Sequence, residues 1–328
     1  MAVGTLFIYT ESATHAGTGT GLGAIDLPIQ RERTTDYPII QGSGVKGSLR
    51  QQYLGDKNDK DKAVVFGPDN EPDYGGAIAV GDARILAFPV RSLKGVLAWA
   101  TCRDVLAHFA RDTAHLEPPL LPAIAPQPQT DYTEAYASTD AVVLDGGTIV
   151  LEDYQYRNVS YTFTVGEEQY FDDNDKEKHY PLAIAWVWAS WLAARALPQT
   201  DSYKSYYHDA FANRFVILPD DDFRDFALYS TEVTTRIKLN RDTKTVDGTA
   251  LFTMESLPAD SLLYVPITTH KPRSPEDKFT GSNFNKDSTD ETVLKWLQNP
   301  EIYPKRIQIG GDETVGYGQV ALRWGGVE

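Results

Sequence analysis

Residues 15–32 have the sequence HAGTGTGLGAIDLPIQRE, in which four glycines alternate with other residues and Asp26 follows them. Glycines let a backbone approach a ligand closely and offer its amides to phosphate. Residues 19–24, GTGLGA, also match the dinucleotide fingerprint, but that motif binds a cofactor only where a helix begins inside it. Pro28 would interrupt such a helix. A nucleotide cofactor and an ordinary flexible loop stay as alternatives to a phosphate-binding loop.

Two further glycine-rich segments suit an RNA ligand. Residues 38–50 read PIIQGSGVKGSLR and predict a helix from about 43 to 54. Lys46 and Arg50 are four residues apart and therefore share one face of this helix. A helix N-terminus beside two cations can bind phosphate, and a solvated basic face is the alternative. Residues 310–320, GGDETVGYGQV, have a glycine–aromatic–glycine pattern typical of RNA-reading sheets, which is a weak signal alone.

The charge balance argues against a free-standing, nonspecific nucleic-acid binder. The 328 residues include 46 acidic and 31 basic side chains, a formal net charge of −15, whereas such binders are normally basic. RNA held in a local groove by a few basic side chains is still compatible with this composition. A case for RNA must therefore come from specific motifs.

The sequence also limits the compartment and the chemistry. Cys102 is the single cysteine, which excludes an intrachain disulfide and a cysteine-based zinc site and fits a reducing cytosol. The N-terminus lacks a secretory signal, and the longest apolar run, residues 182–197, is too short to span a membrane. We expect a cytoplasmic protein with no membrane partner. The chain contains neither HExxH nor GxSxG, so we expect no tightly held zinc and no serine hydrolase.

Strand and helix patterns alternate along the chain and predict an α+β fold. Residues 4–15 and 75–90 predict strands, and residues 141–165 predict a hairpin that turns at 145–147. Helical spacing of apolar residues covers 93–111, 182–197 and 290–298. The last third is rich in strands, at 214–219, 232–240, 249–257, 262–268 and 306–311.

Several motifs occur in a fixed order over nearly the whole chain. After the two N-terminal segments come VFG, GGAIAVGDARILAFPVRSLKGVLAW, TRIKLN, ALFTMESLP and the terminal GGDETVGYG. In combination they resemble the RAMP superfamily of CRISPR effector proteins, and most closely the repeated backbone subunit of the type III-B, or Cmr, complex.

This resemblance implies one RAMP domain over residues 1–328 with a modified RRM-like (ferredoxin-like) core. It implies insertions, including a thumb-like β-hairpin at about 115–180, and a glycine-rich loop at 310–318. It also implies a filament of several copies along a guide CRISPR RNA, together with other Cmr subunits, and cleavage of complementary target RNA at regular intervals. The alternative is a scaffold subunit that binds the guide without cutting.

The resemblance also implies roles for individual residues. Asp26 stands at the position of the cleavage residue, and His15 and Glu255 lie near the site with less settled roles. Lys46 and Arg50 match the basic helix that holds the guide backbone. We expect these two side chains, with Arg236 and Lys238, to line a basic groove, and further RNA contacts from Gly17, Gly19, Gly21, Ser43, Gly310 and Gly311.

The chemistry expected of Asp26 follows from its acidity. A carboxylate with a pKa of about 3.9 is a poor base for a hydroxyl proton at neutral pH. We therefore expect Asp26 to be a ligand of a weakly held Mg²⁺ or Mn²⁺ ion, which stabilises phosphate charge. His15 is expected to relay a proton or to contact phosphate. An aspartate that only stabilises a turn is the alternative for Asp26.

Overall fold

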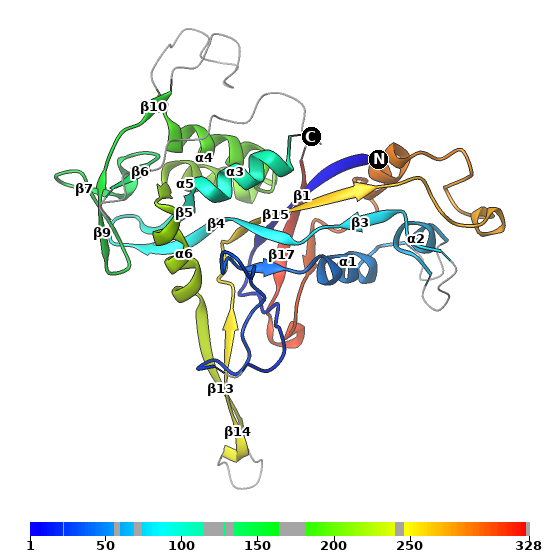
Figure 1. Ribbon diagram of the computed structural model, residues 1–328, viewed down its shortest axis with the longest axis horizontal. Coiled ribbons are helices and arrows are strands. Elements are labelled where there is room, and N and C mark those ends of the chain that lie inside the picture. The colour runs from blue at the N-terminus through cyan, green and yellow to red at the C-terminus, as the bar shows by residue number, and fades with distance from the viewer. Residues whose placement is uncertain are drawn as a thin grey trace. The chain divides into compact units, whose positions relative to one another are not determined.

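The computed structural model describes residues 1–21, 23–55, 60–68, 74–114, 128, 134–163, 182–239 and 246–325, with the backbone alone at 163, 182, 238–239 and 246–250. The chain forms two units, one of Met1–Arg84 with Thr231–Val327 and the other centred on Ile85–Ser230. Helices and strands alternate in both, which confirms the predicted α+β class (Figure 1). No helix of the described residues is long and apolar enough to cross a membrane.

The first unit is built on an antiparallel sheet with β1 at its centre. Strand β1 lies between β15 and β17, and Phe7 is opposite both Tyr264 and Arg323 (Figure 1). Residues 6–9 are at most 1% exposed because both faces of β1 are covered. Strand β16 extends the sheet beyond β17, β3 pairs with β15, and β2 pairs with the first residues of β4. The bounds are β1 (Ala2–Thr10), β2 (Ile39–Ile40), β3 (Ile78–Val80), β4 (Ala83–Ser92), β15 (Leu262–Thr269), β16 (Arg306–Gln308) and β17 (Gln319–Trp324).

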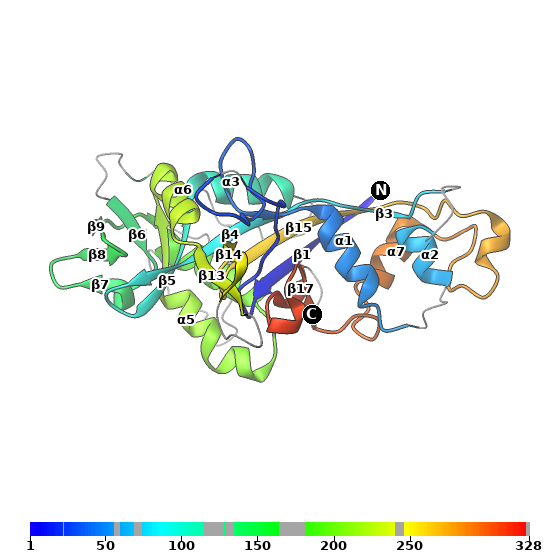
Figure 2. The same cartoon turned by 90° about the horizontal axis from the view of Figure 1, so that it is seen from below.

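Helices of the first unit cover this sheet. Helix α7 contacts β1 and β15, and α1 contacts β3 and β16 (Figure 2). Thr289 caps α7 by accepting a hydrogen bond from the Thr292 amide. Helix α1 begins one residue before the predicted start and ends three residues before the predicted end. The bounds are α1 (Gly42–Gln51), α2 (Lys60–Phe66), η3 (Glu276–Phe279), α7 (Asp290–Leu297) and η4 (Glu313–Val315).

A long hairpin, β13 (Glu232–Leu239) and β14 (Val246–Ser256), forms a separate two-stranded sheet of the first unit and projects from it (Figure 1). Its strands agree with the strands predicted at 232–240 and 249–257. Three of its apolar side chains are more than half exposed, namely Val233, Ile237 and Leu251. The base of the hairpin carries Glu255, so the hairpin leads directly into the site described below.

The second unit has a mixed sheet in the order β4-β5-β12-β6-β9-β8-β7. Strand β12 runs parallel to β5 and antiparallel to β6, and helices α3, α4 and α6 contact this sheet. The bounds are β5 (Val96–Cys102), α3 (Arg103–Asp112), β6 (Glu134–Ala137), η1 (Asp140–Val142), β7 (Val143–Leu144), β8 (Thr148–Leu151), β9 (Tyr154–Asn158), β10 (Thr162–Phe163), β11 (Leu182–Ala183), α4 (Ile184–Arg195), η2 (Tyr203–Tyr207), α5 (His208–Asn213), β12 (Phe215–Leu218) and α6 (Asp220–Tyr229).

The predicted helix at 93–111 is wrong in its first half. Residues 96–102 form β5, and α3 begins only at Arg103. Residues 98–102 are almost completely buried, because β4 and β12 pair with the two edges of β5 and its faces are covered. A strand buried on both faces is apolar at every position, so helical spacing occurs in it by chance. The hairpin turn predicted at 145–147 is confirmed between β7 and β8. Of the expected thumb insertion at 115–180, residues 115–127, 129–133 and 164–180 lie outside the described residues, and residues 134–163 contain β6 to β10.

Candidate active site around Asp26

The glycine-rich stretch folds back on itself beside the hairpin. Backbone hydrogen bonds join the Gly21 amide to the Asp26 carbonyl at 2.7 Å, and the Thr18 amide to the Pro28 carbonyl at 3.1 Å. The second arm of this loop lies along β14, where the Leu27 amide donates to the Thr253 carbonyl at 3.0 Å. In the described part of residues 19–32 no helix begins, so the alternative of a dinucleotide fingerprint is wrong.

Thr253 donates two hydrogen bonds to one oxygen of the Asp26 carboxylate. Asp26 Oδ2 accepts hydrogen bonds from the Thr253 amide at 2.7 Å and from Thr253 Oγ1 at 2.9 Å. The Asp26 amide lies 3.0 Å from the same hydroxyl. The backbone hydrogen bond from Thr253, and then the hydroxyl, lower the pKa of Asp26, which is exposed. Asp26 is therefore ionised at neutral pH, and its Oδ1 makes no hydrogen bond to any residue the structure describes.

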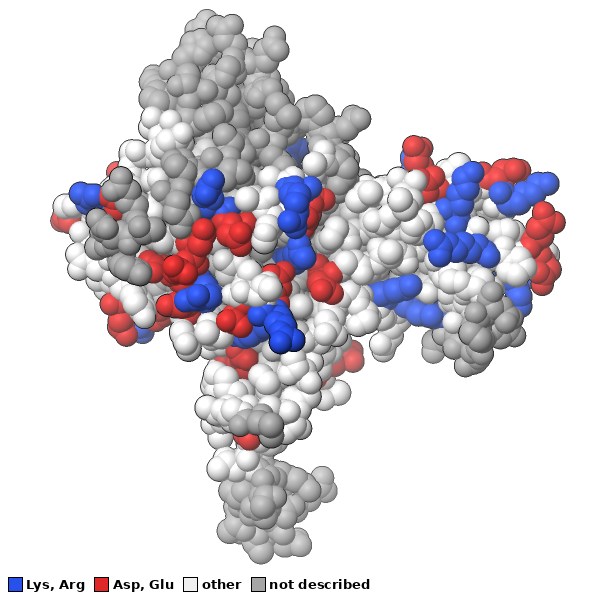
Figure 3. Space-filling view, in the orientation of Figure 1, with Lys and Arg blue, Asp and Glu red and all other residues white. Residues whose placement is uncertain are grey.

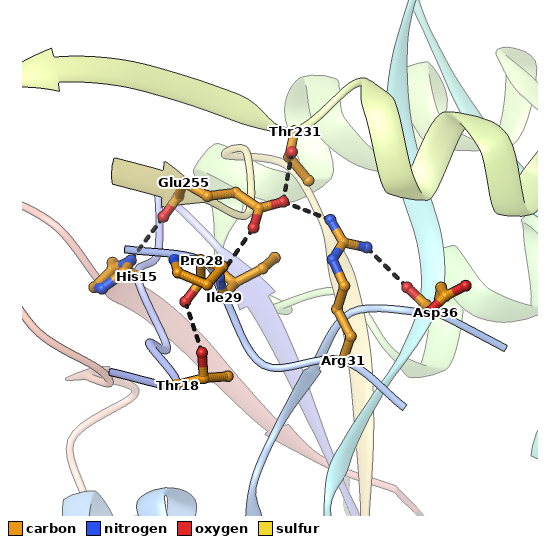
Figure 4. A network of polar contacts seen from close by, with 8 residues as sticks. All are labelled: His15, Thr18, Pro28, Ile29, Arg31, Asp36, Thr231 and Glu255. Atoms are coloured by element: carbon orange, nitrogen blue, oxygen red, sulfur yellow. Dashed lines mark hydrogen bonds and ion pairs between the residues drawn. The ribbon is translucent and has the colours of Figure 1, made fainter. Parts of the chain in front are cut away.

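Glu255 lies two residues further along β14 and is buried, with 3% of its surface exposed. Its Oε1 accepts hydrogen bonds from Arg31 Nη2 at 2.5 Å and from Thr231 Oγ1 at 2.8 Å (Figure 4). Its Oε2 accepts from the Ile29 amide at 3.0 Å. Both carboxylate oxygens are therefore occupied by protein donors.

His15 lies at the start of the loop and is oriented by the main chain of Glu255. His15 Nδ1 is 2.6 Å from the Glu255 carbonyl oxygen (Figure 4). A carbonyl can only accept, so Nδ1 carries a proton, and in the tautomer protonated at Nδ1 alone the lone pair lies on Nε2. A Cβ atom on Gly17 would lie 2.5 Å from His15 Nε2. Gly17 is therefore a glycine because the imidazole occupies the space beside it.

The C-terminal glycine-rich loop meets the same histidine. The Gly311 amide donates to the His15 carbonyl at 2.9 Å. Gly310 has a φ of +91°, and a Cβ there would lie 2.5 Å from that carbonyl oxygen. The two glycine-rich loops, far apart in the sequence, thus pack against each other at His15. The RNA contacts expected of Gly17, Gly310 and Gly311 stay predictions beside these structural roles.

The predicted basic residues lie on two different elements. On α1, Lys46 is half-buried and its Nζ donates to the Ile78 carbonyl at 3.4 Å; burial, and then the charge of Arg50, lower the pKa of Lys46. On β13, Arg236 Nη1 is 3.0 Å from Asp312 Oδ1, and its guanidinium lies 4.8 Å from the centre of the Tyr317 ring. Arg236 is thus tied to the C-terminal glycine-rich loop.

Comparison with known proteins identifies the family. The model of the RAMP superfamily matches residues 7–321. The chain belongs to the RAMP superfamily. The Cmr endoribonuclease Cmr4 of Pyrococcus furiosus is 34% identical over 96% of this chain and 93% of that protein. The crystal structure of oligomeric Cmr4 from the same organism has a TM-score of 0.67 and 27% identity, and it covers 100% of this chain and 99% of its own. A chain of the type III-B Cmr-beta complex bound to cognate target RNA shares the fold, with a TM-score of 0.64 and 18% identity over 99% of this chain and 97% of its own.

This match confirms the resemblance that the ordered motifs predicted, and the structure shows where three of these motifs meet. The loop of residues 15–32, β14 and the C-terminal glycine-rich loop meet at His15 and Glu255. Ser43 is exposed in the first turn of α1, and Gly19 and Gly21 lie in the first arm of the loop. The side chain of Lys238 lies outside the described residues.

Charges on the face shown in Figure 3 are unevenly distributed. Lys and Arg side chains gather over the α2 end of the first unit, while the described part of the β13–β14 hairpin is largely uncharged on this face. The basic groove expected from Lys46, Arg50, Arg236 and Lys238 stays a prediction.

The donor set near Asp26 limits which metal ion this RAMP protein could hold. The described residues contain no group of three or more His, Cys, Asp or Glu side chains that could bind a metal. Of Asp26 and Glu255, the two described carboxylates of this site, Asp26 offers an oxygen without a described protein donor. One carboxylate shared with substrate phosphates and water fits Mg²⁺, which seldom uses an all-protein cage. The residues present therefore fit a weakly held ion that is completed by RNA.

Three site residues escaped sequence reasoning. Thr253 precedes Glu255 by two positions, so the two share a face of β14, and this period could have indicated it. Arg31 lies among the charged residues that end the N-terminal stretch, but no local pattern distinguishes it from Arg33. Thr231 has no signal in the sequence.

Proposed function

We propose that this chain is the repeated backbone subunit of a type III-B (Cmr) CRISPR effector, which binds guide CRISPR RNA and cleaves complementary target RNA at regular intervals. The relative from Pyrococcus furiosus, a Cmr endoribonuclease, supports the activity, and the oligomeric Cmr4 structure supports assembly of several copies. The partners are further copies of the chain, the other Cmr subunits, the guide and the target, and we place this assembly in the cytoplasm.

The observation that carries the catalytic assignment is the state of Asp26. Its carboxylate is exposed and ionised, and two donors on Thr253 fix one oxygen while the other stays free of described partners. A scaffold that only binds a guide does not require a carboxylate held in this way. Asp26 is therefore the residue that faces the phosphate to be cut.

RNA carries its own nucleophile, the 2′-hydroxyl group. Cleavage requires this oxygen in line with the scissile phosphate, so that its bond to phosphorus forms as the bond from phosphorus to the leaving 5′-oxygen breaks. It also requires removal of the hydroxyl proton and stabilisation of charge on the phosphate and the leaving oxygen. Because its pKa is lowered, Asp26 is a weak base. Its free oxygen would instead hold Mg²⁺ or Mn²⁺, and such an ion supplies stabilisation of phosphate charge when bound. His15 Nε2 has the lone pair that can accept the hydroxyl proton.

We further propose that the fold is an RRM-like (ferredoxin-like) core with a thumb-like hairpin that enters the RNA duplex. The sequence predicted the thumb at about 115–180, whereas we propose β13–β14 for this role, because its Val233, Ile237 and Leu251 expose apolar surface that can stack against nucleotide bases. A hairpin inserted between nucleotide bases bends the RNA strand. The bend would lie near the end of the hairpin where Asp26 is hydrogen-bonded to Thr253 of β14. Each copy would then cut once, at the spacing of the subunits.

The test uses the assembled, guide-loaded complex with end-labelled complementary RNA and Mg²⁺. Wild type should produce a regular ladder of products, and Asp26→Asn should abolish it while target binding is retained. Asn keeps the shape of the side chain and removes its charge. A ladder that persists in Asp26→Asn would make the chain a guide-binding scaffold and would move the active site to another subunit.

A further inference from the structure

We propose that Arg31 and the buried Glu255 form a positioning pair that holds both Asp26 and His15 in place, and that Glu255 takes no direct part in the reaction. This inference rests on the proposed function, because it concerns the cleavage site of the same chain. Its basis is the set of contacts around Glu255, which connects three segments of the first unit (Figure 4).

The environment of Glu255 is that of a structural carboxylate. It is 3% exposed, and its two oxygens accept three hydrogen bonds from Arg31, Thr231 and the Ile29 amide. A general base or a metal ligand must present a lone pair to the reacting groups. Protein donors take three of the about four lone-pair sites of this carboxylate, and because Glu255 is 3% exposed the remaining site is not presented to a ligand.

Arg31 is fixed in turn. Its side chain is 15% exposed, and Nη2 contacts Glu255 while Nη1 donates to the Asp36 carbonyl at 2.8 Å. The planar guanidinium is thus held at two of its nitrogens, which leaves it poorly placed to follow an RNA phosphate. Arg31 supplies the positive charge that allows a carboxylate to be buried at this position.

The pair is coupled to both reacting side chains. Glu255 Oε2 holds the Ile29 amide, and the Glu255 amide donates to the Leu27 carbonyl at 2.9 Å. These bonds fasten residues 27–29 to β14, next to the position where Thr253 holds Asp26. The Glu255 carbonyl accepts from His15 Nδ1. A shift of Glu255 therefore moves the metal-binding carboxylate and the imidazole together.

This arrangement predicts non-additive mutations. Arg31→Met keeps much of the apolar stem but leaves the Glu255 carboxylate buried without its counter-charge. Adding Glu255→Gln removes that charge, and the amide oxygen can still accept from the Ile29 amide. The double variant should therefore cleave target RNA faster than Arg31→Met alone. If Glu255 were catalytic, every variant with Glu255→Gln would be inactive.

The experiment measures single-turnover cleavage of saturating target RNA by guide-loaded complexes. Arg31→Met should slow cleavage roughly 10- to 100-fold, because a displacement of about 1 Å has effects of that size. The double variant should cleave at least roughly tenfold faster than Arg31→Met. Arg84→Met is the matched control, since it removes the ion pair of Glu32, the residue next to Arg31; it should cleave at the wild-type rate.

Each outcome separates this inference from the proposed function. Cleavage by Asp26→Asn in the same assay would refute the proposed function itself. If Asp26→Asn is inactive and the double variant is as inactive as Asp26→Asn, the positioning role is wrong and Glu255 is catalytic. If Arg31→Met does not assemble, the single variant Glu255→Gln tests the inference. A cleavage rate within roughly tenfold of wild type supports the positioning role. Complete loss of cleavage in an assembled, guide-loaded complex overturns it.

Discussion

Gly17→Ala is expected to disable the site by displacing His15. The added Cβ would lie 2.5 Å from His15 Nε2 and 3.1 Å from Cε1, whereas ordinary contact begins at 3.4 Å. The imidazole and the new methyl group must therefore separate by about 0.9 Å, the difference between 3.4 and 2.5 Å. No positive φ is recorded at Gly17, so backbone strain contributes nothing and the effect is steric.

The ring has little freedom to accommodate the methyl group. Its Nδ1 is hydrogen-bonded to the Glu255 carbonyl at 2.6 Å, and even a Cβ atom on Gly311 would lie only 3.7 Å from its Cδ2 atom. Moving the ring by this distance stretches or misaligns the Nδ1 hydrogen bond, at a cost of about 0.5–1.5 kcal/mol in the free energy of unfolding. If His15 takes part in proton transfer, a displacement of about 1 Å should lower the cleavage rate roughly 10- to 100-fold.

Gly23→Ala is the matched control in the same loop. A Cβ at Gly23 would have no described atom within 4 Å, so this variant should unfold and cleave like wild type. The two variants are compared by thermal unfolding of the chain and by single-turnover cleavage in the guide-loaded complex. Wild-type cleavage by Gly17→Ala would show that the position of His15 does not matter for the reaction and would refute this reasoning.

Three further predictions concern other contacts of the first unit. Thr253→Val removes the hydrogen bond from the hydroxyl to Asp26 and keeps the one from the amide. The pKa of Asp26 should rise towards its ordinary value and the cleavage rate should fall roughly tenfold. Thr253→Ser, which retains a hydroxyl, should cleave like wild type, and equal rates for the two variants would contradict a role of this hydroxyl in holding Asp26. Removal of divalent ions with a chelator should stop product formation and leave target binding intact, and a ladder that persists would exclude a metal at Asp26. Burial raises the pKa of Asp260 above its ordinary 3.8, opposed by the hydrogen bond from Tyr9. The folded chain therefore binds this proton more tightly, so its contribution to stability is full below the ordinary pKa and is lost as pH rises through the folded value. The melting temperature of wild type should fall relative to that of Asp260→Asn as the pH rises above 3.8, and parallel curves would contradict this assignment.

The sequence alone determined the family and most of the local structure. The order of the glycine-rich motifs identified the RAMP superfamily, and this depends on residue types and their succession, which need no coordinates. Strands such as β15 and helices such as α4 and α7 were predicted from apolar patterns and agree with the structure to within a few residues. The two helices satisfy their backbone hydrogen bonds within the element, and β15 is a short run rich in apolar residues, so the signal of each lies within a short window.

The tertiary structure decided those features that depend on residues far apart in the sequence. The strand β5 was mistaken for helix because its apolar run fits both periods, and pairing with β12, more than a hundred residues later, makes it a strand. The site has the same character, since the hydrogen bonds Asp26–Thr253, Arg31–Glu255 and His15–Glu255 join residues 227, 224 and 240 positions apart. A carboxylate that acts on RNA and one that holds a loop are the same residue type. Only burial and the number of donors around each distinguish the free oxygen of Asp26 from the occupied oxygens of Glu255.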